Sequence, residues 1–186
     1  MTEILFYHLE QQPLEQVLPL LLEKSLQKGW RAVVETAAQK DLEPLDRALW
    51  TYSAQSFLPH EIRDGETAAP ASGTTPGPET ARETEAPIVL CCGTANPNHA
   101  HIRFFVRGAQ PVQPVHDGEM RESGQKGNGQ AEREQGATAY QRLVYLFDGH
   151  DPEQVNTARS AWKALCRDHQ TTYWQQQPDG RWQKKG

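Results

Sequence analysis

Three basic residues, Arg159, Lys163 and Arg167, follow one another at intervals of four in the segment 152–168. On a helix this interval aligns side chains along one face. Guanidinium and ammonium groups there can bind a carboxylate, the guanidinium through two parallel hydrogen bonds. With Trp162 as an apolar edge, the pattern suits an acidic peptide that ends in a hydrophobic residue. A solvated basic face gives the same spacing, and composition alone favours that simpler interpretation.

Phe57 is a further aromatic candidate, because it follows an expected helix and stands two residues before Pro59. An aromatic residue at such a place can line a pocket or cover the edge of the core, and composition leaves both interpretations open. We assign Trp50, on the apolar face of the preceding helix, to the core.

Thiol and imidazole groups occur together between residues 91 and 101, and zinc accepts both as ligands. The set is Cys91, Cys92, His99 and His101. Its spacing matches no zinc pattern, and adjacent cysteines on a strand point to opposite faces of the sheet. We therefore predict buried, structural cysteines and neither a metal nor another cofactor.

Groups for acid–base catalysis are scattered along the chain, at His8, His60, Asp148 and His150. Nothing in their spacing brings them together, and no nucleophile motif such as G-x-S-x-G occurs. A phosphate site in an α/β domain needs glycines directly after the first strand, so that backbone N–H groups can approach the phosphate. Residues 10–13 contain no glycine. We expect no catalytic residues.

The elements that must position these residues follow from the apolar patterns. Short apolar runs predict strands at 3–9, 31–37, 87–92, 102–106 and 143–147. Helical periodicity predicts helices at 13–28, from 41 to about 50, and at 152–168. Residues 173–182 predict a small hairpin with a Pro-Asp-Gly turn at the edge of the domain. Alternating strands and helices indicate a single α/β domain, a mostly parallel sheet with helices on both faces, resembling a mononucleotide-binding (Rossmann-like) fold without a phosphate loop.

The helix at 152–168 has the clearest start. Asp151 is suited to the N-cap, Pro152 to the first helical position, and Gln154 to completing a capping box. Its inward stripe is expected to contain Val155, Ala158, Trp162, Leu165 and Cys166. The basic residues should then lie along an adjacent face.

The whole chain has 186 residues, a net charge of −5 and three cysteines. Such a charge argues against a protein that wraps nucleic acid, and three cysteines form no disulfide framework. No apolar run is long enough to span a membrane, so we expect a cytoplasmic protein. Residues 64–86 and 109–137 are poor in large apolar residues and are predicted to be disordered or loop insertions.

Several groups of residues together carry a family resemblance. They are Ile-Leu-Phe-Tyr at 4–7, Leu-Asp-Arg-Ala-Leu-Trp at 45–50, Ser-Phe-Leu-Pro-His at 56–60, and Arg159, Trp162 and Lys163. In order and spacing they resemble the chi subunits of DNA polymerase III. The resemblance covers roughly 1–63, 87–107 and 140–174.

This resemblance implies a non-catalytic accessory subunit of the bacterial replicative polymerase. One surface would bind the acidic C-terminal tail of the single-stranded-DNA-binding protein, and another would bind the psi subunit, which connects to the clamp loader; contact with DNA would be indirect. Carried over by motif, Arg159 and Lys163 would pair with carboxylates of the tail. Trp162 stands at an aromatic position of the family, and Phe57 would help to form the apolar pocket.

Two other functions remain open from the sequence. The fold class also suits a nucleotide-dependent or hydrolytic enzyme, although only the architecture and the scattered histidines favour it. The C-terminal segment could stack single-stranded DNA bases through Trp174 and Trp182 beside Arg181, Lys184 and Lys185. A structural hairpin is the interpretation we prefer for that segment.

Overall fold

The computed structural model describes residues 2–63, 84–93, 96–110, 140–167 and 169–185. Its strands are β1 (Glu3–Leu9), β2 (Ala32–Thr36), β3 (His60–Arg63), β4 (Ile88–Cys91), β5 (Ile102–Val106), β6 (Arg142–Asp148), β7 (Gln170–Gln176) and β8 (Trp182–Lys184). Its helices are α1 (Leu14–Gln27), α2 (Leu42–Thr51) and α3 (Pro152–Leu165), with a 3-10 turn at Gln39–Asp41. None of these helices is both long and apolar enough to cross a membrane.

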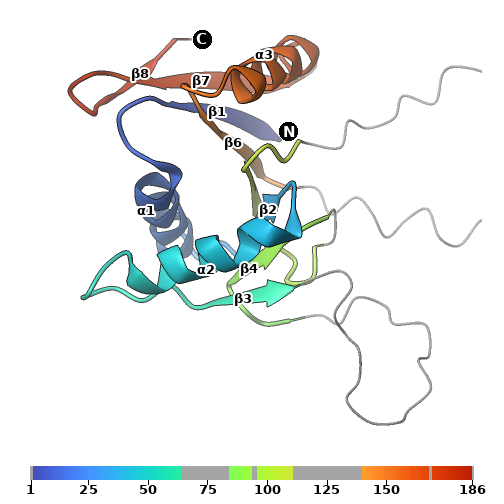
Figure 1. The fold of residues 1–186 in the computed structure, drawn as a ribbon. Coiled ribbons are helices and arrows are strands. Elements are labelled where there is room, and N and C mark those ends of the chain that lie inside the picture. Colours follow the sequence, from blue (N-terminus) through green and yellow to red (C-terminus); the bar gives the residue numbers. More distant parts are fainter. Residues whose placement is uncertain (1, 64–83, 94–95, 111–139, 168, 186) are drawn as a thin grey trace, which may run out of the picture.

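The strands of the described residues form one sheet in the order β3-β4-β2-β5-β6-β1-β7-β8 (Figure 1). Neighbouring strands are parallel, except that β8 runs antiparallel to β7. β3 and β8 are therefore the two edges. A single α/β domain with a Rossmann-like sheet is confirmed.

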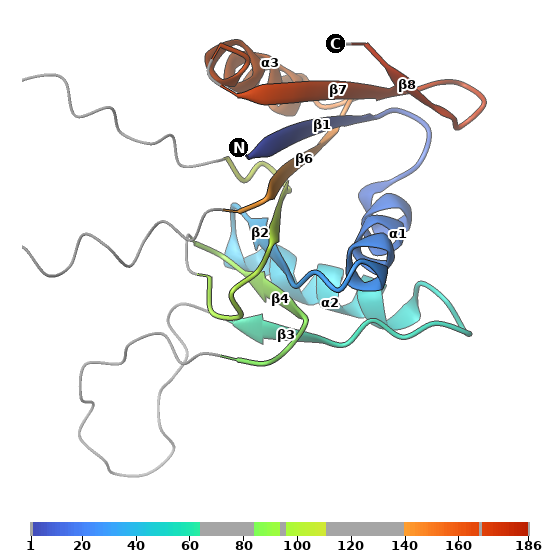
Figure 2. The same ribbon diagram turned by 180° about the vertical axis from the view of Figure 1, so that it is seen from behind.

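Helices cover both faces of the sheet, as Figures 1 and 2 show from opposite sides. α1 and α2 share one core with the sheet, in which Leu18, Leu22 and Leu45 are almost fully buried. α3 packs on the other face through Ala158 and Leu165. The inner strands β2, β4 and β5 are buried along their whole length, which explains their near-continuous apolar sequences.

The five predicted strands are confirmed, with ends shifted by a residue or two. β3 was not predicted, because it is a four-residue polar segment at the edge of the sheet. The predicted hairpin is present, with Gly180 at positive φ in its turn. Its first arm is in addition a full sheet strand, β7, parallel to β1. The predicted insertions lie outside the described residues, apart from 84–86 and 109–110.

Two predicted core residues prove to be exposed. Trp50 is 56% exposed, because it lies on the outer side of α2 while Leu45 and Leu49 face the sheet. Cys166 is exposed because α3 ends at Leu165. Asp41 stands at the N-cap of α2, as predicted, but its side chain caps no N–H group.

The chain changes face between two neighbouring strands. β1 leads into α1 on one side of the sheet, whereas β6, its parallel neighbour, leads into α3 on the other. In doubly wound folds, ligands bind in the crevice at the carboxyl ends of such a strand pair. This crevice is therefore the first place to look for a site.

Candidate functional site

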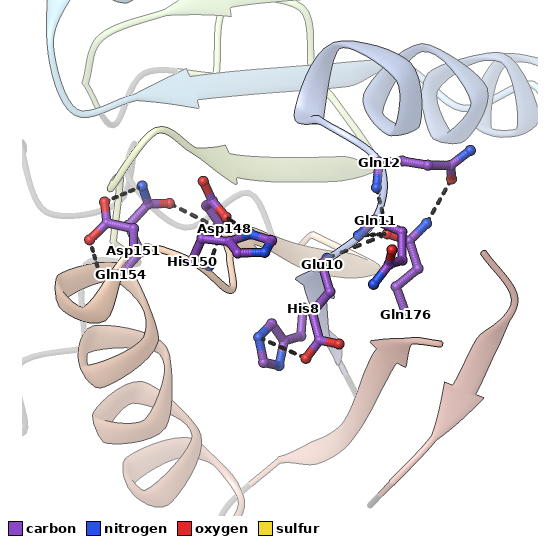
Figure 3. Close-up of polar contacts among 9 residues, drawn as sticks. All are labelled: His8, Glu10, Gln11, Gln12, Asp148, His150, Asp151, Gln154 and Gln176. Atoms are coloured by element: carbon purple, nitrogen blue, oxygen red, sulfur yellow. Dashed lines mark hydrogen bonds and ion pairs between the residues drawn. The ribbon is translucent and has the colours of Figure 1, made fainter. Parts of the chain in front are cut away.

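The loop that follows β1 lines the crevice beyond β1 and β6, and the side chain of Gln176, at the end of β7, is bonded to this loop (Figure 3). The backbone N–H groups of Glu10, Gln11 and Gln12 all donate to the Gln176 Oε1, with N···O distances of 3.4, 2.9 and 3.0 Å. Its Nε2 donates to the Gln12 Oε1 at 2.7 Å. These are the N–H groups that a phosphate would need in a nucleotide-binding relative of the fold. An internal amide occupies them here.

At the start of α3, on the other side of the crevice, backbone N–H groups are likewise bonded to a side chain of the protein itself. Asp151 accepts hydrogen bonds from the backbone N–H groups of Glu153 and Gln154, which confirms the predicted N-cap. The capping box differs from the usual pattern, because the Gln154 amide donates to the Asp151 carboxylate and accepts from the Asp148 N–H. These hydrogen bonds, chiefly that from the Gln154 side chain, lower the pKa of Asp151.

Three of the four predicted acid–base candidates come together at this crevice, which their sequence spacing did not indicate: His8 on β1, Asp148 at the end of β6, and His150 just after it. His8 is largely buried, and its Nδ1 lies 2.9 Å from the Tyr173 hydroxyl. Burial is the main cause that lowers the pKa of His8, so its imidazole is neutral near pH 7. His150 is exposed and pairs with Asp148 at 3.1 Å. No Ser, Thr or Cys is among the described residues lining the crevice.

The other two chemical clusters are separated by the fold. His60 lies on the edge strand β3, where its ring contacts Asp46 and the Leu58 carbonyl. Cys91 and Cys92 pack on opposite faces of the sheet, as predicted. Burial raises the pKa of Cys91 to about 11. Across the described residues, no three His, Cys, Asp or Glu side chains are grouped to hold a metal ion.

A pocket of about 250 Å³ lies between α3 and the C-terminal hairpin. It is lined by Arg159, Trp162, Lys163, Tyr173 and Lys185. Three of the five residues are cations and two are aromatic, and no carboxylate is among them. None of the three cations forms an ion pair with another described residue.

Contacts with each other and with the core fix the positions of the two aromatic residues of this pocket. The Trp162 ring stands edge-on to Tyr173 at a centroid distance of 5.7 Å and to Phe6 at 5.4 Å, a favourable geometry for aromatic pairs. The two residues pack against the core under α3 and are only half-buried. They therefore present an apolar surface of fixed shape beside mobile cationic side chains.

Three of the four predicted site residues meet in this pocket, because a four-residue interval on α3 aligns Arg159 with Lys163 and Trp162 lies beside them. Arg167 is exposed and does not line it. Sequence reasoning missed Tyr173 and Lys185. The predicted hairpin could have indicated them, since it brings residues 173 and 185 side by side.

Phe57 is not part of this pocket. It follows α2 next to the edge strand β3, whereas the pocket lies beside β7 near the opposite edge. Its ring packs on that of Trp50, with centroids 5.2 Å apart, and Trp50 lies at the same distance from His60. Phe57 is 58% exposed. Trp50 and Phe57 thus form a separate exposed aromatic surface, the Trp50–Phe57 surface.

Comparison with known proteins decides the family. Residues 1–172 match the family described as DNA polymerase III chi subunit, HolC. The chain belongs to the chi subunit family. A protein of Rickettsia prowazekii (strain Madrid E), named "Probable DNA polymerase III subunit chi", is 26% identical over 106 residues, which make up 57% of this chain and 55% of that protein. The chain therefore matches about half the length of this curated relative.

The chi-family match confirms the resemblance read from the sequence. It covers only part of the pocket. Arg159, Trp162 and Lys163 lie inside the match, whereas Tyr173, Gln176 and Lys185 lie beyond residue 172. The C-terminal hairpin thus adds two of the five lining residues to a helix of the chi family.

Proposed function

We propose that this chi-family protein is a non-catalytic accessory subunit of the bacterial replicative DNA polymerase, and that it binds the acidic C-terminal tail of the single-stranded-DNA-binding protein. The observation that carries the proposal is the pocket between α3 and β7, which is lined by three cations and no carboxylate. The chain as a whole has a net charge of −5. A cationic pocket on an acidic protein selects acidic ligands against the background of the protein's own field.

The pocket can bind both the carboxylates of such a peptide and its hydrophobic last residue. Arg159 can bind the terminal carboxylate through two hydrogen bonds, and Lys163, one turn along α3, adds a second positive charge. The half-buried rings of Trp162 and Tyr173 offer an apolar contact for a hydrophobic last residue. The ligand is therefore an acidic peptide with an apolar C-terminus rather than nucleic acid.

The Trp50–Phe57 surface supplies the second partner contact of the proposed adaptor. Exposed aromatic residues that pack on one another are typical of protein interfaces rather than of free surfaces. We assign this surface to the psi subunit or another clamp-loader component. We call the pocket between α3 and the C-terminal hairpin the tail pocket; it is lined by Arg159, Trp162, Lys163, Tyr173 and Lys185. In this proposal Phe57 belongs to a partner site, but not to the tail pocket that the family resemblance suggested.

An enzyme on this fold has less support. The N–H groups at the carboxyl ends of β1 and β6 are bonded to Gln176 and Asp151, and no Ser, Thr or Cys is among the described residues that line the crevice beside His8 and His150. Direct stacking of DNA bases by the hairpin also has less support, because Trp174 and Trp182 pack around Tyr7, with centroid distances of 6.5 and 5.0 Å. DNA contact through protein partners fits these observations better.

The test is a fluorescence-polarisation titration of a labelled peptide from the C-terminus of the host's single-stranded-DNA-binding protein. We expect saturable binding that weakens with salt, because ion pairs in an open pocket are screened. Lys163→Glu should weaken binding at least tenfold. Arg167→Glu is the matched control, since it makes the same charge change one turn further along, outside the pocket, and should cost less than threefold.

Two further peptides and variants sharpen this test. A peptide amidated at its C-terminus should bind more weakly, since Arg159 loses the terminal carboxylate. Phe57→Ala should keep wild-type affinity for the tail. Absence of binding by the wild type at low salt, or equal losses in Lys163→Glu and Arg167→Glu, would show that the pocket is not the tail site.

A further inference from the structure

The C-terminal hairpin contributes a cation to the tail pocket through its strand register. β7 and β8 pair antiparallel, with Trp174 opposite Lys184. The next pair along is Tyr173 and Lys185, and the Lys185 N–H donates to the Tyr173 carbonyl at 2.8 Å. Directly opposed residues of antiparallel strands project to the same face of the sheet. Tyr173 faces α3, and so Lys185 does too.

Lys184 has the opposite orientation. Successive residues of a strand alternate between faces, and the partner of Lys184 is Trp174, whose ring packs near Tyr7 in the core on the α1 side. Lys184 does not line the pocket, whereas Lys185 does. The two adjacent lysines are both exposed and carry the same charge, but their side chains project to opposite faces of the sheet.

We propose that Lys185 is a third cation of the tail pocket and contacts a carboxylate of the bound acidic peptide, so that the C-terminal hairpin takes part in partner recognition. The proposal rests on the proposed function of the pocket. It goes beyond it because Lys185 and Tyr173 lie outside the residues that match the chi family. The hairpin contributes Tyr173 and Lys185 to the pocket, and α3 contributes Arg159, Trp162 and Lys163.

The position of the hairpin is fixed rather than adventitious. Gln176, at the end of β7, is fully buried and bonded to three N–H groups of the β1–α1 loop. β7 also pairs with β1 over six residues. Lys185 directly follows β8, which pairs with this anchored strand β7, and its own side chain is exposed.

The experiment compares Lys185→Glu with Lys184→Glu in the full chain, using the same labelled tail peptide. Both variants change the net charge equally, so their long-range effect on an acidic peptide is alike. We expect Lys185→Glu to weaken binding about tenfold and Lys184→Glu less than threefold. Lys185→Ala should weaken it about two- to fivefold, in keeping with one exposed ion pair. Circular dichroism spectra of all variants should match the wild type.

The outcomes separate this inference from the function on which it rests. If the wild type binds and Lys163→Glu abolishes binding, while Lys185→Glu and Lys184→Glu behave alike, the hairpin's role is overturned and the tail pocket stands. If the wild type does not bind the peptide, both are overturned. A loss specific to Lys185→Glu supports both.

Discussion

At the residue scale, His8 connects the crevice at the carboxyl ends of β1 and β6 with the tail pocket. Its ring stacks on Phe147 at 5.0 Å and contacts the hydroxyl of Tyr173, which lines the pocket. The space around it is tight, because a Cβ atom at residue 149 would collide with the imidazole. Only glycine fits there. A Gly149→Ala substitution would displace the β6–α3 connection or His8 itself.

His8 makes the stability of the protein depend on pH. Burial lowers its pKa below 6.5; Arg159 and His150 act in the same direction, while Glu10 and Asp148 oppose it. The unfolded chain therefore binds a proton on His8 at a pH where the folded chain does not. The stabilisation is fully present above pH 6.5 and is lost as the pH falls toward the lower, folded-state pKa.

Urea unfolding between pH 8 and pH 5.5 measures this effect. The free energy of unfolding of the wild type should fall more steeply below pH 6.5 than that of His8→Gln, which has no titrating group there. The difference between the two proteins at pH 8 gives the part that is independent of protonation. Parallel curves over the whole range would show that His8 is not the group responsible.

At the scale of elements, the side chain of Gln176 joins the C-terminal hairpin to the loop that starts α1. α1 begins at Leu14, and its N-cap residue Pro13 makes no side-chain hydrogen bond to the helix. In the loop just before the helix, the N–H of Gln12 donates to the amide oxygen of Gln176, which lies 164 positions away in sequence. A long-range contact thus holds the chain where it enters α1.

Gln176→Ala should lower the free energy of unfolding by about 2–4 kcal/mol, because three partly buried N–H groups of the β1–α1 loop would lose their shared acceptor. Gln183→Ala, on the exposed part of β8, is the control and should change it by less than about 0.5 kcal/mol. Urea denaturation of both variants at pH 7 measures the effect. Equal stabilities would mean that water replaces the Gln176 amide at no cost.

The elements that sequence patterns predicted well are those with a strong local signal. The central strands are short and mostly apolar, and α3 combines a cap, a proline and a regular basic face. β3 and the polar strand β7 owe their structure to pairing with β4 and β1, and no local pattern reports such pairing. The same holds for the site: spacing on one helix predicted Arg159 and Lys163, whereas Lys185 depends on strand register.

The position of Phe57 could not be predicted from local patterns either. The family resemblance implied that Phe57 helps to form the same pocket as the α3 residues, and in the structure it does not line the pocket between α3 and β7. Sheet order, which sequence periodicity does not report, puts β3 at one edge and β7 one strand from the other. Trp50 was misassigned for a related reason, since helical spacing alone does not distinguish the buried edge of an apolar stripe from its exposed edge.

At the scale of the whole molecule, the two proposed partner surfaces lie toward opposite edges of the sheet. The Trp50–Phe57 surface adjoins β3, and the tail pocket lies over β7. Neither partner needs to displace the other. Such an arrangement suits a bridge between two proteins.

Independent binding is the prediction at this scale. Saturation with the tail peptide should change the affinity for a purified psi-type clamp-loader component less than twofold. Trp50→Ala together with Phe57→Ala should weaken that second interaction at least tenfold while leaving tail binding unchanged, and Lys163→Glu should do the reverse. Isothermal titration calorimetry measures both affinities on one sample. Competition between the two ligands would contradict separate surfaces.

The position of β1 also affects how the chain folds during synthesis. β1 leaves the ribosome well before its neighbours β6 and β7, which begin at residues 142 and 170. At ordinary translation rates the apolar β1 segment waits on the order of ten seconds for its first strand partner. Throughout that interval the nascent chain exposes both hydrogen-bonding edges of a strand that is prone to aggregate. Production of this protein should therefore improve with slower, cooler expression and with chaperones that hold extended apolar segments.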